Sequence, residues 1–234
     1  SELNVLLDLL DNDTYPLQKA IHQRRSAVSM DRETRIDRNT FFQFLIKTSP
    51  QLNPAPFQSF PWEPQVHLGL FVHRVNDLPT GLYLLVRNEN HLKELKEKFK
   101  KEFLWRKPDF CPEALGLFVL EEGDYVGLSK SVSCGQDIAG DGCFSLGMLS
   151  AFEKPLTQYG SWFYPRLYWE CGAIGQVLYL QAEVSGIRST GIGCFFDDPV
   201  HDIFGIKDMS YQTLYHFTVG GPVEDKRLTT LPPY

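Results

Sequence analysis

Two arginines and a serine stand side by side near the start of the chain, at Arg24, Arg25 and Ser26. Guanidinium groups bind phosphate oxygens in a bidentate manner, so this triplet predicts a phosphate-binding site. The triplet also falls at the end of a predicted helix, where arginine complements the negative end of the helix dipole. Taken alone, it favours this second interpretation, a solvated helix end.

A second candidate site is the glycine-punctuated segment Gly191, Ile192 and Gly193. Glycines allow a backbone to approach a flat ligand closely and to offer its amide groups. The segment is not a Gly-x-Gly-x-x-Gly fingerprint, because Phe196 stands at the last position. A Rossmann dinucleotide site is therefore not supported, and a tight turn between a helix and a strand is an equally good interpretation.

Other patterns that carry catalysis are missing from the sequence. The histidines at positions 22, 67, 73, 91, 201 and 216 have no metal-ligand spacing, so we expect no metal site. No Gly-x-Ser-x-Gly motif occurs, and no serine stands in a recognisable catalytic-triad context. A hydrolase is therefore not expected.

The elements that position these residues are helices and strands in mixed order. Periodicity and capping residues predict helices over residues 3–10, 16–24, 36–47, 89–105, 132–152, 168–185 and 198–204. Alternation and turn residues predict strands over 66–75, 82–86, 114–120 and 211–219, the first two forming a hairpin-like pair, and a short strand or turn over 191–196.

No repeat and no linker divides the chain, so we expect a single α+β domain over residues 1–234 with a mainly antiparallel sheet. Residues 1–15 are a candidate N-terminal extension. The segment 49–64 holds five prolines and predicts a long loop with extended parts. The chain opens Ser-Glu-Leu without Met, and it can be one half of a longer protein with two such units.

Composition excludes some classes of function. The 234 residues include 23 lysines and arginines against 29 aspartates and glutamates, a formal net charge of −6. Nucleic-acid binding needs a basic surface, so nucleic acid is not an expected partner. The apolar runs are too short to span a bilayer and no secretory signal is visible, so no membrane partner is expected. The 13% aromatic content suits a thick core, a subunit interface or a pocket for a flat ring.

The five cysteines form an odd set without any Cys-x-x-Cys pair. In a chain of this length, that pattern predicts neither a zinc site nor a disulfide framework. We therefore expect reduced thiols, packed as small hydrophobic groups in a cytoplasmic protein.

The order of the motifs along the chain is more specific than any one of them. Arg24-Arg25-Ser26 is followed by the helix Glu170-Cys-Gly-Ala-Ile-Gly-Gln176 and by Ser185-Gly-Ile-Arg-Ser-Thr-Gly-Ile-Gly-Cys-Phe-Phe-Asp-Asp198. The ending consists of His216-Phe-Thr-Val-Gly-Gly-Pro222 and Asp225-Lys-Arg-Leu-Thr-Thr-Leu-Pro-Pro-Tyr234. This order resembles the nitroreductase superfamily over residues 16–234, most strongly after Glu170. Phe71-Val-His-Arg-Val and Gly81-Leu-Tyr are similar to its SagB type, which includes the azoline dehydrogenases of modified peptides.

The resemblance implies an α+β fold that holds FMN at two sites between paired subunits, so a homodimer is expected. It implies that Arg24, Arg25 and Ser26 bind the flavin phosphate and ribityl chain. Arg227 would add a second phosphate contact, with Lys226 as a weaker candidate. The backbone of Gly191, Ile192 and Gly193 would lie near the isoalloxazine edge.

The chain departs from the SagB type at two places. Azoline dehydrogenases carry a Lys-Tyr pair before the long helix, where this chain has Gln158 and Tyr159. Glutamine cannot exchange a proton as lysine does, so the resemblance leaves Tyr159 as the one catalytic candidate, as a weak acid. The alternative is a tyrosine of the core or of a subunit interface. The proline-rich segment 50–64 replaces the Ser/Gly-rich segment that covers the flavin in the family.

Three functions follow from the resemblance. The first is an FMN-dependent oxidoreductase that takes hydride from NAD(P)H or from an organic substrate. The second is an azoline dehydrogenase that tailors a peptide heterocycle. The third is a flavin-free interaction protein that has kept the fold. The absorbance spectrum of the purified protein separates the third function from the other two.

Overall fold

The computed structural model describes residues 16–229 and residue 231, so the helix predicted at 3–10 lies outside the described residues. The strands are β1 (Val66–Val72), β2 (Gly81–Leu85), β3 (Leu117–Glu122), β4 (Phe144–Ala151), β5 (Arg188–Ile192) and β6 (Tyr211–Gly220). The α-helices are α2 (Leu17–Gln23), α3 (Arg38–Lys47), α4 (Leu92–Lys98), α5 (Val126–Val132), α6 (Ile138–Asp141), α7 (Glu153–Tyr159), α8 (Tyr164–Val184) and α9 (Asp197–Phe204). Short 3-10 helices cover Phe57–Ser59, Glu89–His91 and Ser161–Phe163.

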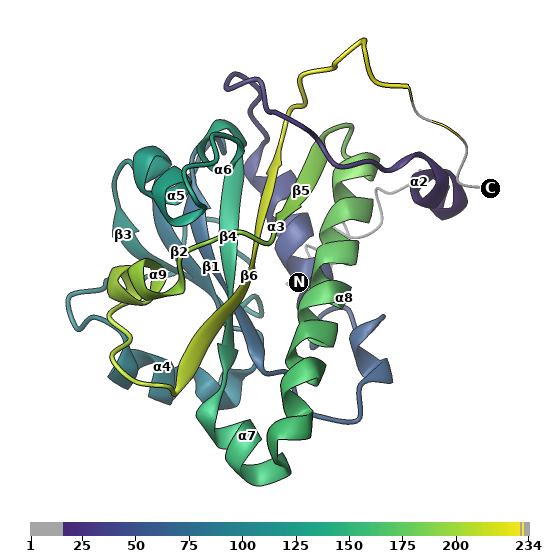
Figure 1. Cartoon of the computed structure of the whole chain (residues 1–234). Helices are drawn as coiled ribbons and strands as arrows, with labels where there is room; N and C mark the ends of the chain where they lie inside the picture. Colours follow the sequence, from purple (N-terminus) through teal and green to yellow (C-terminus); the bar gives the residue numbers. More distant parts are fainter. Residues whose placement is uncertain (1–15, 230, 232–234) are drawn as a thin grey trace.

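The strands form one sheet in the order β3-β2-β1-β4-β6-β5, and each neighbouring pair is antiparallel. Figure 1 shows helices on both faces of this sheet, which confirms the predicted α+β class with an antiparallel sheet. The predicted hairpin is confirmed as the β1–β2 pair, with Leu68 opposite Leu85.

The helix predicted at 132–152 is wrong, because most of it is the central strand β4. Only Val132 at the end of α5 and the single turn of α6 are helical within that range. Every residue of β4 is buried, since the strand lies between β1 and β6 with helices over both faces. A strand buried on both faces has no polar alternation, so its apolar run cannot be told from a buried helix by periodicity.

The helix predicted at 89–105 is shorter than expected. It consists of a 3-10 turn followed by α4, which ends at Lys98. Beyond this end the chain leaves the helical path and turns the rings of Phe99 and Phe103 into the core, 3% and 6% exposed. The Lys100 N–H donates to the Phe204 carbonyl at 2.9 Å instead of continuing the helix, so a tertiary contact overrides the local helical pattern.

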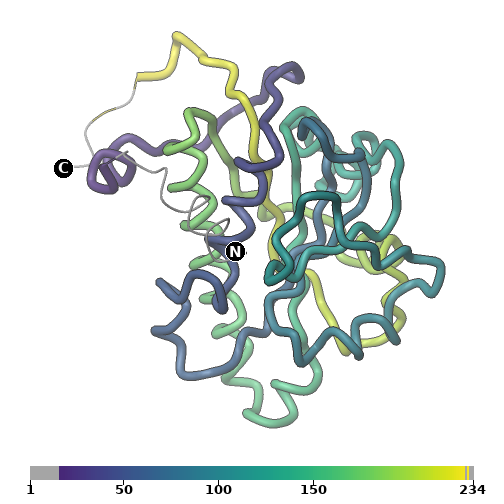
Figure 2. The backbone as a smooth tube through the Cα atoms, turned by 180° about the vertical axis from the view of Figure 1, so that it is seen from behind, coloured from purple at the N-terminus to yellow at the C-terminus, as the bar shows by residue number. Residues whose placement is uncertain are grey.

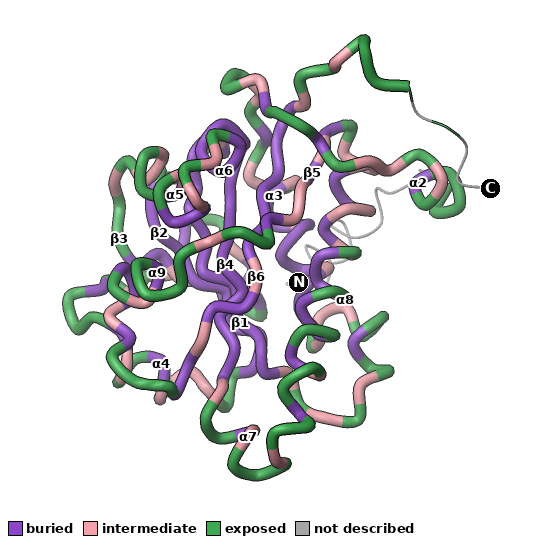
Figure 3. The backbone as a smooth tube through the Cα atoms, viewed as in Figure 1, coloured by how far each residue is buried: buried purple, intermediate pink, exposed green. Residues whose placement is uncertain are grey.

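Two layers of core lie on the two faces of the sheet. One is packed by α3 and α8, and the other by α4 and α9. Figure 3 shows the central strands almost wholly buried between these layers. Helix α8 faces the sheet with residues spaced three or four apart, which are Leu167, Cys171, Ile174, Leu178 and Ala182. The described helices include none that is long and apolar enough to cross a membrane.

A buried ion pair fixes α8 to the sheet. Arg87 follows β2 and is 0% exposed, and its guanidinium pairs with Glu170 on α8, which is 1% exposed. The Glu170 carboxylate also accepts the backbone N–H groups of Gln65 and Val66 at 3.0 and 3.2 Å. Arg87 donates further to the carbonyls of Thr48 and Val66 at 2.6 and 2.8 Å. The network ties three segments to one turn of α8.

The proline-rich segment 49–64 lies beside the first turns of α8. Figure 2 shows this blue segment next to the green helix, seen from behind. The ring of Trp62 lies 5.4 Å from that of Phe163 and 6.4 Å from that of Trp169. The segment is thus a loop, as the sequence predicts, and the structure adds a 3-10 turn at Phe57–Ser59 and a packed aromatic contact.

The prediction of five reduced cysteines is wrong for two of them. Cys134 and Cys194 form a disulfide, with Cα atoms 5.9 Å apart, while Cys111, Cys143 and Cys171 are free thiols. The two residues are 60 positions apart in sequence, so no short spacing reveals the pair. The sheet brings them together, because the chain after β5 returns to the end of α5, where the Phe196 N–H donates to the Val132 carbonyl at 2.8 Å.

Candidate functional site

The predicted arginine segment (Arg24–Ser26) and the predicted glycine segment (Gly191–Gly193) meet at the side chain of Tyr179 on α8. The Tyr179 hydroxyl shares a hydrogen bond of 2.8 Å with the Ser26 hydroxyl. It also accepts the backbone N–H of Gly191 at 3.0 Å. One phenol therefore joins segments that are 165 positions apart in the sequence, the difference between 191 and 26.

The segment after α2 runs alongside β5, which explains this meeting. Ser26 forms a parallel bridge with Ser189, and the Thr190 hydroxyl donates to the Ala27 carbonyl at 2.7 Å. The Arg24 guanidinium lies over the Tyr179 ring, 4.9 Å from its centroid. This is a cation–π contact, and it holds the positive charge close to the Ser26 and Gly191 hydrogen bonds.

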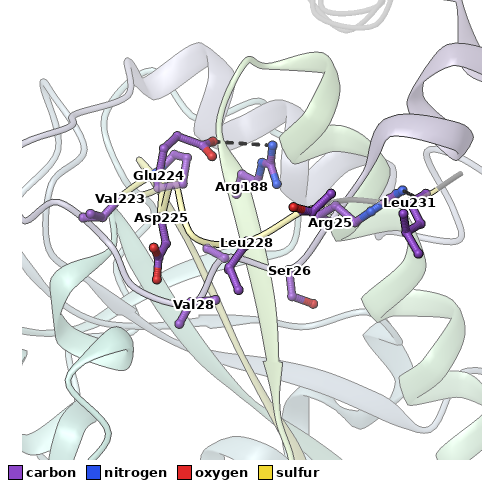
Figure 4. A pocket seen from close by; sticks show the side chains of 12 residues that line it. Arg25, Ser26, Val28, Arg188, Val223, Glu224, Asp225, Leu228 and Leu231 are labelled. Atoms are coloured by element: carbon purple, nitrogen blue, oxygen red, sulfur yellow. Dashed lines mark hydrogen bonds and ion pairs between the residues drawn. The ribbon is translucent and has the colours of Figure 1, made fainter.

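Arg25 and Ser26 line a hollow of about 440 Å³, which we call the arginine hollow (Figure 4). Its other walls come from Arg188 on β5 and from the chain after β6, including Glu224 and Asp225. Arg188 pairs with Glu224 at 3.5 Å. Arg25 donates to the carbonyls of His22 and Arg24 at 3.0 and 2.7 Å, which fixes its guanidinium at the rim.

Arg227 and Lys226 are not brought to the other predicted phosphate contacts. The Arg227 side chain is 90% exposed and binds the carboxylate of Asp225 in its own turn, at 2.7 Å. Lys226 is exposed, and neither residue lines the arginine hollow. The structure places Arg188 there instead. The roles of Arg227 and Lys226 stay predictions.

A second hollow, of about 230 Å³, lies between α8 and β6, and we call it the glycine hollow. Gly172 and Gly175 of α8 and Tyr215 and Phe217 of β6 line it, and Tyr179 closes the end nearest Ser26. A Cβ atom added to Gly172 would meet no atom within 4 Å, so a side chain there would fill open space. The glycine thus keeps the hollow free.

The polar groups that line the glycine hollow are uncharged at neutral pH. Burial raises the pKa of the Cys171 thiol and of the Tyr168 and Tyr215 phenols. These groups therefore stay protonated. The hollow offers aromatic and glycine surfaces of no net charge, which suit a flat and largely apolar ring.

The predicted Gly191-Ile192-Gly193 backbone lies at the edge of this hollow. A Cβ atom on Gly191 would lie 2.6 Å from the Tyr215 hydroxyl, so any other residue there would displace the Tyr215 ring. Ile192 is 2% exposed and packs in a small core cluster with Ala27 and Met30. Gly193 is exposed where the chain leaves β5. The three residues therefore differ in surroundings, and the amide of Gly191 is already bonded to Tyr179.

Tyr159 lies apart from the other predicted site residues. It ends α7, is 39% exposed and stacks against Phe163, with ring centroids 4.7 Å apart. Figure 1 places α7 at the opposite end of α8 from β5. The fifteen positions from Tyr164 to Tyr179 span roughly 22 Å of helix. The catalytic role of Tyr159 stays a prediction.

Sequence reasoning missed Tyr179, Arg188 and Tyr215. Tyr168, Gly172, Gly175 and Tyr179 share one face of α8, because they are spaced four, three and four residues apart. This face is distinct from the buried stripe. Its helical spacing could have been recognised in the sequence as a second functional face of the helix. Arg188 and Tyr215 had none, since they face the hollows only through the pairing of β5 with β6.

Comparisons with known proteins give one family. A family model described as the Nitroreductase family matches residues 76–221. Among solved structures, the chain is similar to a candidate nitroreductase from Anabaena variabilis, with a TM-score of 0.67 and 23% identity over 88% of this chain. No curated protein matches the chain.

Two further structures share the fold. A candidate nitroreductase from Ralstonia eutropha has a TM-score of 0.62 and 13% identity, covering 90% of this chain and 85% of its own. The Escherichia coli microcin synthetase McbBCD complex with truncated pro-MccB17 bound has a TM-score of 0.60 and 16% identity, covering 94% and 81%. This chain spans only 38% of the length of the Anabaena protein.

Proposed function

Because the chain belongs to the nitroreductase family, we propose that it is an FMN-dependent oxidoreductase that acts on a small organic substrate. When bound, FMN supplies the hydride chemistry, and the protein supplies position and electrostatics. The observation that carries the proposal is the pair of hydrogen bonds by which Tyr179 joins Ser26 to Gly191.

The residues of the two hollows fit the two ends of FMN. Gly172 leaves open space beside aromatic rings, as a flat ring requires. Arg25 and Arg188 line the neighbouring hollow, and Arg24 stands next to it over Tyr179. The hollows adjoin at the Ser26–Tyr179 hydrogen bond, so one ligand with a ring and a phosphate can occupy both.

Carboxylates in the arginine hollow limit its positive charge. Glu224 pairs with Arg188, and Asp225 pairs with Arg227. A phosphate would compete with Glu224 for the Arg188 guanidinium. Arg24 makes no such pair with a carboxylate among the described residues, so we assign it the largest share of phosphate binding.

Arg24→Ala is expected to weaken FMN binding by roughly tenfold to a hundredfold. A charge-assisted hydrogen bond contributes about 1.5–3 kcal/mol, and about 1.4 kcal/mol corresponds to a factor of ten. Titration of the flavin-free protein by fluorescence quenching measures the affinity. Arg24→Lys should recover only part of it, because an ammonium lacks the planar fork of guanidinium.

Riboflavin and a distant arginine are the controls for this titration. Riboflavin lacks the phosphate, so it should bind the wild type and Arg24→Ala equally. Arg38→Ala removes a guanidinium that lies 3.9 Å over Phe110 on another part of the surface, and it should leave FMN affinity unchanged. Equal FMN affinity in the wild type and Arg24→Ala would refute the phosphate assignment. Binding of FAD in preference to FMN would refute the choice of cofactor.

We also propose a homodimer formed through an exposed aromatic face at the start of α8, made by Trp162 of the preceding 3-10 helix and Trp169 of α8. Trp162 and Trp169 are 57% and 52% exposed, and the Arg166 guanidinium stacks on both rings at 5.0 and 4.3 Å. Large exposed aromatic surface of this kind marks interaction sites. A second copy of the chain is the proposed occupant, because proteins of this family are often homodimers.

Light scattering at micromolar concentration should give near twice 26.8 kDa. Trp169→Glu places a charge within the proposed interface and should shift the mass to that of the monomer. Leu104→Glu is the matched control, because Leu104 is 55% exposed away from α8, and it should leave the dimer intact. A wild-type monomer, or a dimer that persists in Trp169→Glu, would contradict the interface.

The SagB-type assignment stays an alternative within the same family, with azoline oxidation of a peptide as its reaction. Gln158 and Tyr159 close α7, away from both hollows, so this reaction would need the partner subunit to complete the site. Reduction of the bound flavin by NAD(P)H under nitrogen supports the first function over this alternative. A purified protein that takes up no flavin would support the flavin-free interaction protein.

A further inference from the structure

A third hollow, of about 400 Å³, lies between the first turns of α8 and the start of α9. We call it the acid–aromatic pocket, because its walls include the rings of Tyr164, Tyr168 and Phe195 and the carboxylates of Asp197 and Asp198. Tyr168 lines both this pocket and the glycine hollow. The pocket is therefore the neighbour of the hollow in which we place the flavin ring.

The aromatic walls are held in place by their own contacts. The rings of Tyr164 and Tyr168 meet edge to face at 5.3 Å, and their hydroxyls are 3.1 Å apart. Phe195 stacks on His216 at 4.5 Å with an interplanar angle of 10°. The Cys134–Cys194 disulfide anchors the residue just before Phe195. These walls are therefore preformed, which lowers the entropic cost of binding.

The pocket carries negative charge. Asp197 is oriented by the Gln212 amide, which donates to it at 2.9 Å, and the Asp198 carboxylate makes no hydrogen bond or ion pair within the described part of the chain. Both carboxylates stand in the first turn of α9, where the helix dipole stabilises their ionised form. Burial lowers the pKa of His201, so this nearby imidazole is neutral at pH 7.

A buried hydroxyl at the pocket lacks a partner. Thr213 lines the pocket and is 2% exposed, and its Oγ1 has no hydrogen-bond partner among the described residues. A buried hydroxyl without a partner costs about 1–3 kcal/mol. A Cβ atom added to Gly147 of β4 would lie 3.3 Å from this Oγ1, so the hydroxyl faces the sheet beneath the pocket.

We propose that the acid–aromatic pocket binds the substrate of this oxidoreductase and selects small protonated amines that carry an aromatic ring. The ammonium group would pair with Asp198 and Asp197, and the ring would lie against Tyr164, Tyr168 and Phe195. Aromatic faces attract cations, and the carboxylates reject anions of the same shape. The role as substrate site rests on the proposed function, whereas the binding of amines does not.

Calorimetric titration with 2-phenylethylammonium chloride at low salt tests the pocket. The ammonium compound should bind at least about tenfold more tightly than 2-phenylethanol, which has the same shape without the charge. Asp198→Asn should remove most of this difference. Asp202→Asn is the matched control, because Asp202 lies on the same helix and does not line the pocket, and it should change the affinity by less than about twofold.

Equal binding of the amine and the alcohol, no binding of either, or equal effects of Asp198→Asn and Asp202→Asn would overturn the proposal. The titration is carried out with and without saturating FMN, so the two proposals fail separately. A protein that binds the amine but no FMN would refute the proposed oxidoreductase alone. A protein that binds FMN but not the amine would refute the pocket alone.

Discussion

Gly172→Leu is expected to abolish detectable FMN binding, with a loss of at least about a hundredfold, while the protein stays folded. The leucine side chain would occupy the open space of the glycine hollow, where a Cβ atom meets nothing within 4 Å. Forcing side chain and ligand into the same volume costs about 1–3 kcal/mol or more, and 2.7 kcal/mol is about a hundredfold in affinity. Fluorescence titration of the flavin-free variant measures the loss.

Stability separates a blocked site from a damaged fold. Glycine within a helix is less favourable than alanine by about 0.8–1 kcal/mol, and leucine ranks next to alanine, so Gly172→Leu should unfold at the same temperature as the wild type or higher. Gly127→Leu is the matched control, because Gly127 lies in α5 with nothing within 4 Å of an added Cβ. It should retain FMN. Normal FMN affinity in Gly172→Leu would show that the ring does not lie in the glycine hollow.

The fold was predictable where periodicity is unambiguous. The buried stripe of α8 and the β1–β2 hairpin carry clear helical and turn signals, and both are confirmed. The error at β4 has a physical cause, since the period-2 signal needs one polar face and this strand has none. The Cys134–Cys194 disulfide could not be predicted from the sequence, because the two residues are 60 positions apart and only the tertiary fold brings them together.

The candidate site was predictable in part. Arg24, Ser26 and Gly191 were found from residue type and order, and the structure brings them together at Tyr179. Arg227 was assigned from the order of motifs alone, and its guanidinium stays in its own turn. Arg188 lines the hollow through strand pairing, which a single sequence does not display. Motif order locates segments, but side-chain direction depends on their neighbours.

Arg87→Met is expected to destabilise the protein by about 3–5 kcal/mol, because it leaves the Glu170 carboxylate buried without its cation. The same change removes donors from the carbonyls of Thr48 and Val66. The lost contacts hold one turn of α8, the helix that lines the glycine hollow and the acid–aromatic pocket. Urea unfolding followed by circular dichroism gives the free energy of unfolding.

Arg106→Met is the matched control for the buried pair. Arg106 pairs with Glu122, but the two side chains are 42% and 49% exposed, so water already solvates both charges. An exposed pair of this kind contributes about 0–1 kcal/mol, and the control should lose no more than that. Glu170 also accepts two backbone N–H groups, and Glu170→Leu would leave both without an acceptor. Adding Glu170→Leu to Arg87→Met should therefore not restore the free energy of unfolding. Equal losses of unfolding free energy in Arg87→Met and Arg106→Met would mean that burial does not make the Arg87–Glu170 pair more important for stability than an exposed pair.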